Sequence, residues 1–109
     1  MIRAEMNYAL EKADEIETEL KRIGLWSSDP LPESAYTYRG AFAMDTMSFE
    51  QWLQFILLPT LREIAAEDGR FPKATGFGQR AIIEFDGLDH GDRLIALLGE
   101  LEAWVEAQP

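Results

Sequence analysis

The chain contains no cysteine and only one histidine. Without cysteine there is no disulfide framework, no thiolate metal site and no thiol nucleophile. With His90 as the sole histidine, a zinc or iron site built from several imidazoles is excluded. No apolar run approaches the ~20 residues that a membrane helix requires, and the amino end lacks a basic segment followed by an apolar one. We therefore expect a cytoplasmic protein that does not enter the membrane.

Positive charge is also scarce. Ten lysines and arginines stand against twenty aspartates and glutamates, which gives a formal net charge of −10. The basic residues are scattered along the chain, so the overall field repels phosphate groups. We expect neither direct nucleic-acid binding nor adsorption to an anionic membrane. A basic protein partner fits this charge, although acidity that merely keeps a small protein soluble is the simpler interpretation.

The length of 109 residues predicts a single domain, residues 1–109, with one core. Apolar residues recur at steps of three and four, which indicates amphipathic helices, and no run has a strand partner. We expect an all-α fold, an up-and-down four-helix bundle. The four helices are expected at residues 2–23, from Ser48 to about Ala66, at 79–85, and from about His90 to Ala107.

The first expected helix carries an apolar stripe of heptad type. Most often such a stripe is one seam of an antiparallel bundle within the chain. The alternative is a seam against a second copy, that is, a homodimer through helix 1. The stripe consists of Ile2, Met6, Ala9, Ala13, Ile16, Leu20 and Ile23.

The second expected helix is the most apolar and begins with a capping-box pattern, Ser48 followed by Gln51. We expect it to be central in the fold, with four core side chains nearly inaccessible to solvent. Pro59 lies inside it and lacks the N–H that a helix needs there, so the helix either kinks or breaks in two, and a kink is favoured. The four core side chains are Trp52, Leu53, Ile56 and Leu57.

Between these helices, residues 24–47 show no convincing helix or strand, and both prolines near its start oppose helix. The long loop holds Trp26, Tyr36, Tyr38 and Phe42, which is much aromatic area to leave in water. Either the loop wraps the bundle or it presents a binding surface; wrapping is favoured.

No group of residues has the pattern of a catalytic or metal site. Asp86, Asp89, His90 and Asp92 lack the spacing of a calcium loop, and a turn followed by a helix cap explains them. No serine has a nucleophile-elbow context, and the two glycines of residues 76–78 lack the third glycine of a dinucleotide loop. We expect no enzyme activity, no cofactor and no metal.

Asp45 is the acidic residue of greatest interest, because it precedes the buried helix. Its expected role is architectural, accepting hydrogen bonds from loop or helix-start groups. In the competing interpretation Pro59 frees the carbonyl of Phe55 beside Gln51, Gln54 and Asp45. Those groups would then line a small polar pocket.

Several of these residues together resemble the YqcC-like family of small bacterial proteins. The resemblance is specific from about Leu20 to Arg62 and looser through the last helix. One departure is Phe55, where the family often has tryptophan. The matching residues are Trp26, Asp29-Pro30, Pro32, Met44-Asp45-Thr46-Met47, Gln51-Trp52-Leu53-Gln54 and Leu58-Pro59.

The resemblance implies an all-helical fold and brings no activity, cofactor or catalytic residue. The family's gene commonly lies beside that of a tRNA pseudouridine synthase of the C type, which implies an accessory role in tRNA modification. We therefore expect a non-enzymatic accessory or interaction protein, whose partner is that synthase or another protein. The alternative is a small-molecule binder or an enzyme of unrecognised type. The candidate binding residues are Trp26, Tyr38, Asp45, Gln51 and Gln54.

Overall fold

The computed structural model describes residues 4–67, 69–71 and 76–108. One helical segment without interruption, residues 49–66, occupies the middle of the chain. It consists of α2 (Phe49–Trp52), a π-helical turn (Leu53–Leu57) and α3 (Leu58–Ala66). The capping box predicted at its start is confirmed: the Ser48 side chain accepts from the Gln51 backbone, and the Gln51 side chain accepts from the Ser48 N–H at 2.9 Å.

The π-helical turn lies immediately before Pro59, the second residue of α3. The N–H of Leu58, the residue that follows this turn, bonds to the Leu53 carbonyl five residues back instead of four. Such wide turns accommodate irregularity inside a helix, and here one precedes a residue that cannot donate a backbone hydrogen bond. The helix thus continues through Pro59 and does not break in two. The kink itself stays a prediction.

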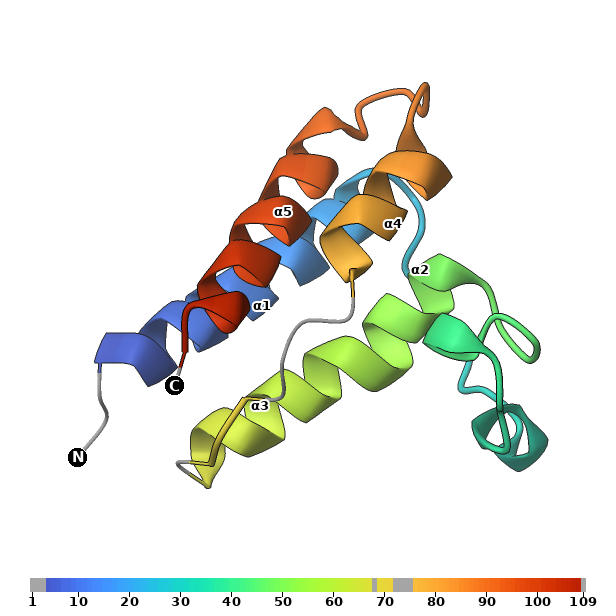
Figure 1. Ribbon diagram of the computed structural model, residues 1–109. Coiled ribbons are helices and arrows are strands. Elements are labelled where there is room, and N and C mark those ends of the chain that lie inside the picture. The colour runs from blue at the N-terminus through green and yellow to red at the C-terminus, as the bar shows by residue number, and fades with distance from the viewer. Residues whose placement is uncertain (1–3, 68, 72–75, 109) are drawn as a thin grey trace.

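Three further helices complete the fold, and the described residues contain no strand. They are α1 (Ala4–Arg22), α4 (Phe77–Phe85) and α5 (Asp92–Glu106). Figure 1 shows α1 and α5 side by side and running in opposite directions; α1 also packs on α3, and α4 packs on α5. The all-helical prediction is confirmed. One detail is wrong: Gly91 precedes α5 with no side-chain cap bond, so neither Asp89 nor Asp92 caps it.

The apolar stripe of α1 is covered by the chain's own helices. Ala9, Ala13, Ile16 and Leu20 are all fully buried and belong to one core with Leu53, Leu58 and the apolar face of α5. The side chains of Ile2 and Met6 lie outside the described residues. From Ala9 to Leu20 the stripe is therefore buried within the chain itself. A homodimer through α1 stays a prediction that would need another face of this helix.

The central helix is less completely enclosed than expected. Leu53 is 0% exposed and Leu57 is 9% exposed, as predicted, but Trp52 and Ile56 are only half-buried, so the expectation for these two was wrong. Both pack against a small second cluster of Ala35, Ala43 and Met47, which the loop supplies, and Trp52 packs against the main core as well. Because a loop covers this face incompletely, the ring of Trp52 keeps contact with solvent.

A second correction concerns α4. The sequence pattern of residues 79–85 places Ala81, Ile82 and Phe85 on one face of a helix, but Ile82 is 53% exposed. The helix begins two residues earlier than expected, and Phe77, Ala81 and Phe85, spaced four apart, form its buried stripe. That spacing leaves Ile82 on the flank of the helix.

The first test concerns the central core. Phe49 is 0% exposed and contacts Phe42, Trp52 and Phe85. Phe49→Ala should lower the free energy of unfolding by about 3–5 kcal/mol, because it removes a buried ring and leaves a cavity. Urea unfolding measures this loss. The control is Ile83→Ala, whose side chain is 68% exposed and should change stability by less than ~0.5 kcal/mol. Similar losses in both variants would contradict the assigned core.

Candidate functional site

The loop that follows α1 is anchored to the helices at its start. Gly24 has φ of 81°, a left-handed conformation that suits glycine, and the N–H groups of Leu25 and Trp26 both bond to the Leu20 carbonyl. The Trp26 ring is half-buried against the main core, and the Lys21 ammonium lies 5.0 Å from its centroid. Trp26 therefore acts as an anchor of the loop, and its exposed part is small.

Gln54 fastens the loop to the central helix. Its side-chain oxygen accepts the Ser27 N–H at 2.8 Å, and its nitrogen donates to the Ser27 carbonyl at 2.8 Å. The side chain is 8% exposed, so both bonds lie away from water. Helical spacing places Gln54 on a polar strip with Glu50, Gln51 and Arg62, opposite the apolar face, but the structure buries its side chain. Its amide instead satisfies both backbone groups of one loop residue.

Asp45 holds the far part of the loop. Its two carboxylate oxygens accept the N–H groups of Arg39 at 2.9 Å and Gly40 at 3.0 Å, which confirms the predicted hydrogen bonding. These two bonds lower the pKa of the Asp45 carboxyl below its ordinary value, because they favour the charged form. A side chain at Gly40 would bring its Cβ within 3.1 Å of an Asp45 oxygen, so this turn is tightly closed.

The part of the loop between Ser27 and Asp45 has a strained backbone. Residues 24–47 contain two short 3-10 helices that the sequence did not predict, Glu33–Tyr36 and Ala41–Ala43. Phe42 and Ala43 both have φ of 54°, which costs on the order of 1–3 kcal/mol per non-glycine residue. Two contacts stabilise it: the Phe42 ring packs edge-on at 5.0 Å from the Trp52 ring, and the Thr46 hydroxyl donates to the Ala35 carbonyl at 2.5 Å.

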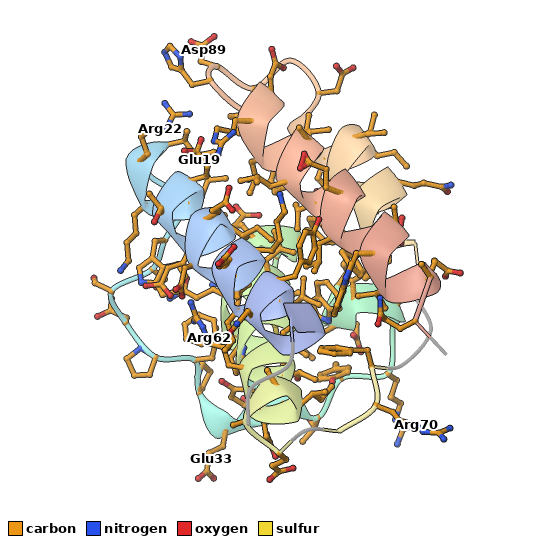
Figure 2. All side chains as sticks on the ribbon, turned by 90° about the vertical axis from the view of Figure 1, so that its left-hand side faces the viewer. Glu19, Arg22, Glu33, Arg62, Arg70 and Asp89 are labelled. Carbon is orange, nitrogen blue, oxygen red and sulfur yellow. The ribbon has the colours of Figure 1, made fainter. Side chains whose placement is uncertain are left out.

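Trp26, Asp45, Gln51 and Gln54 fix the loop and the start of the central helix, and we call these residues the frame. Supported by this frame, the loop presents apolar side chains to solvent. Tyr36 is 46% exposed, and Tyr38 and Met44 are each 38% exposed. We call these three residues the loop surface. Figure 2 shows Glu33, from the same loop, pointing outward at the edge of the molecule. The loop therefore both wraps the helices, through Trp26 and Phe42, and leaves a surface available for contact.

The five candidate binding residues thus divide into two groups. Tyr38 is on the loop surface. Trp26, Asp45, Gln51 and Gln54 belong to the frame, because the polar groups of the last three bond to backbone atoms. Open surface pockets occur elsewhere among the described residues, one of about 320 Å³ between α4 and α5 beside Gln79 and Glu102, and another of about 220 Å³ between α1 and α5 beside Asp14, Glu15 and Arg93. None of Asp45, Gln51 and Gln54 lines either cavity.

Most basic side chains of the described residues are neutralised by acids. Arg62 of α3 bonds to Asp14 and Glu17 of α1, both at 2.9 Å. Glu19 lies next to Arg22 at the end of α1 (Figure 2), and the 2.6 Å ion pair lowers the pKa of the Glu19 carboxyl. Further pairs are Lys12–Glu100, Lys21–Glu17, Arg80–Glu84 and Arg93–Glu15. These pairs leave little positive charge for a phosphate group.

Two further classes of site are absent from the described part of the chain. No three His, Asp or Glu side chains there come together in a way that could hold a metal ion, and this includes the acids around His90. Nor does any helix within residues 4–67, 69–71 or 76–108 combine the length and apolar content needed to cross a membrane.

The fold and the loop define a small all-helical protein. Residues 9–104 match the DUF446 family, which carries the description tRNA pseudouridine synthase C, and the chain belongs to this family. An uncharacterised protein of Haemophilus influenzae is 24% identical over 85 residues, which cover 75% of this chain and 80% of that protein.

A second relative is much longer. The tRNA pseudouridine synthase C of Pectobacterium carotovorum is 28% identical over 68 residues, which make up 62% of this chain but 18% of that protein. The chain therefore corresponds to a minor part of the synthase, and most of the synthase lies outside the match. No solved structure matches the chain.

The second test concerns Asp45. Asp45→Asn should lower the melting temperature and speed amide hydrogen exchange at Arg39 and Gly40, because a neutral amide accepts these two bonds less strongly. Asp45→Glu should not restore slow exchange, since the extra methylene misplaces the carboxylate. Exchange at other amides of α1 and α5 serves as the control. Unchanged exchange at Arg39 and Gly40 in Asp45→Asn would contradict the architectural role.

The same bonds predict an acid response. The folded-state pKa of Asp45 lies below the ordinary 3.8, so the stabilisation is complete well above pH 3.8 and is lost as the pH falls through the lowered pKa. In the wild type, exchange at Arg39 and Gly40, corrected for the intrinsic pH dependence, should rise over that range. In Asp45→Asn, the corrected exchange at these two amides should not rise over that range.

The third test concerns Gln54. Gln54→Ala leaves the buried N–H and carbonyl of Ser27 without their partner, which should cost about 1–3 kcal/mol of unfolding free energy. Thermal or urea unfolding provides the measurement. Gln54→Glu is the close comparison, because its carboxylate can accept the Ser27 N–H but places a buried negative charge against the Ser27 carbonyl, so a loss at least as large is expected. A Gln54→Ala protein as stable as the wild type would exclude this fastening.

Proposed function

We propose that this protein is a non-enzymatic accessory protein that binds a tRNA pseudouridine synthase in the cytoplasm. The observation that carries the proposal is the match to 18% of a much longer chain named tRNA pseudouridine synthase C. In that longer protein, the segment related to this chain is part of the same polypeptide as the rest of the synthase. Covalent attachment gives two modules a high effective concentration, whereas a separate chain must have a docking surface of its own.

The charge of the chain supports contact with the enzyme over contact with RNA. A net charge of −10 opposes phosphate binding, and most described basic side chains are already paired with acids. An enzyme that acts on tRNA needs a basic surface, and an acidic protein is complementary to such a surface. Because this chain is acidic and the enzyme surface is basic, association with the enzyme is favoured over association with the nucleic acid.

The proposed contact is the loop surface of Tyr36, Tyr38 and Met44. Tyrosine is enriched among residues that dominate binding energy, since it brings large area with few rotatable bonds. Asp45 and Gln54 hold this surface in one conformation, so little entropy is lost on binding. In this proposal the four helical segments form an up-and-down bundle that is bent at Pro59. The bundle serves as the rigid support of the loop.

No specific observation favours the alternative, a small-molecule binder or enzyme with a polar pocket at Asp45, Gln51 and Gln54. The side-chain groups of all three bond to backbone atoms of this chain. A ligand would have to displace those bonds.

The fourth test is direct binding. Isothermal titration calorimetry of the purified protein with a tRNA pseudouridine synthase of the C type should show a saturable 1:1 complex. The double variant Tyr36→Ala/Tyr38→Ala should bind about 30-fold more weakly, the size of a hot-spot loss. Thr60→Ala, on the exposed part of α3, is the control and should bind as the wild type does.

A gel shift with tRNA completes this test. The protein alone should produce no shift even at low salt. A tight, salt-sensitive shift by the protein alone would contradict the charge argument. Absence of any complex with the synthase would contradict the proposed function, while equal binding of the double tyrosine variant would remove only the assignment of the loop surface.

A further inference from the structure

The outer face of α4 carries apolar side chains that nothing in the described structure covers. Ile82 is 53% exposed, Ile83 is 68% exposed, and Leu88, in the turn after the helix, is 38% exposed. Helix propensity does not account for two adjacent isoleucines, because β-branched residues lower it. Core packing does not account for them either, because Phe77, Ala81 and Phe85 fill the buried side of this helix. The structure therefore leaves apolar area uncovered on this side of α4.

Acidic side chains border this apolar area. Asp86, Asp89 and Asp92 are all exposed, and none of the three forms an ion pair with a described residue. Figure 2 shows Asp89 at the tip of the turn, pointing away from the protein. By contrast Glu84 is paired with Arg80 at 2.6 Å, and Arg93 with Glu15 at 3.0 Å. We call Ile82, Ile83, Leu88, Asp86 and Asp89 the α4 surface.

The turn that carries part of this surface is held in one conformation. The Leu88 N–H bonds to the Phe85 carbonyl, and the Gly91 N–H bonds to the Leu88 carbonyl, each at 3.0 Å. His90 has φ of 62°, and its carbonyl accepts a bond at 3.1 Å from the Arg22 guanidinium of α1. An element that is fixed before binding loses little freedom when it docks.

We propose that the α4 surface docks a protein surface of complementary chemistry, with an apolar centre bordered by lysine and arginine. The identity of this partner rests on the proposed function: a tRNA-acting enzyme carries basic surface of this kind. A second copy of the chain is disfavoured because the same acids would face one another. This contact is separate from the loop surface and adds a second point of attachment to the same enzyme.

The test measures binding of the purified synthase to three variants. Ile82→Ser/Ile83→Ser removes the apolar centre and should weaken binding about 30-fold. Serine has a helix propensity close to that of isoleucine, so circular dichroism and melting should match the wild type. Asp86→Lys/Asp89→Lys should slow association about tenfold at low salt, with a smaller difference at high salt.

The matched control is Glu63→Lys/Glu67→Lys on the exposed side of α3, which changes the net charge by the same amount. It should stay within about twofold of the wild type. Equal losses in both charge variants would show a long-range field effect and overturn the α4 assignment.

Three other outcomes are decisive. Absence of wild-type binding overturns both the proposed function and this assignment. Wild-type binding that the isoleucine variant retains overturns this assignment alone. In light scattering, a concentration-dependent dimer of the wild type that Ile82→Ser/Ile83→Ser abolishes would assign the surface to a second copy and overturn the proposal.

Discussion

The structure depends on one helical segment, residues 49–66, whose apolar side chains must be covered from more than one direction. A chain without cysteine has no disulfide to stabilise a small fold, so stability must come from burial. The helices cover Phe49, Leu53 and Leu58 in the main core. Trp52 and Ile56 also face a second, smaller cluster whose buried residues lie outside the α-helices. The long loop covers Trp52 and Ile56 with Ala35, Ala43 and Met47, so the packing of the helix and the conformation of the loop depend on each other.

This arrangement explains why the loop keeps a strained conformation. To bring Ala43 and Phe42 onto Trp52, the backbone takes two successive left-handed residues that are not glycine. Asp45, Thr46 and Gln54 then fix the loop through backbone groups at Arg39 and Gly40, Ala35 and Ser27. The consequence for function is that the exposed Tyr36 and Tyr38 are carried by a fixed frame. A polar side chain that resembles a binding residue in the sequence can therefore act instead by holding the loop in place.

The sequence predicts the helices well because their signals are local. The Ser48–Gln51 capping box, the apolar stripe of α1 and the glycine after it each report on a few neighbouring residues. The features that were missed depend on distant partners. Nothing local distinguishes a Gln54 that faces solvent from one that bonds to Ser27, and alanine at position 43 carries no signal for a left-handed backbone. The burial of Trp52 and Ile82 depended on which segment covers each helix face, and a helical periodicity does not contain that information.

We propose docking on a tRNA pseudouridine synthase, and the most direct test is amide hydrogen exchange of the protein with and without that enzyme. Exchange reports the segments that binding covers or stabilises. The account predicts slower exchange in the enzyme complex within residues 33–47 and 82–92, with little change along the middle of α1. Unchanged exchange throughout the chain, or protection confined to the ion-paired face of α1, would contradict it.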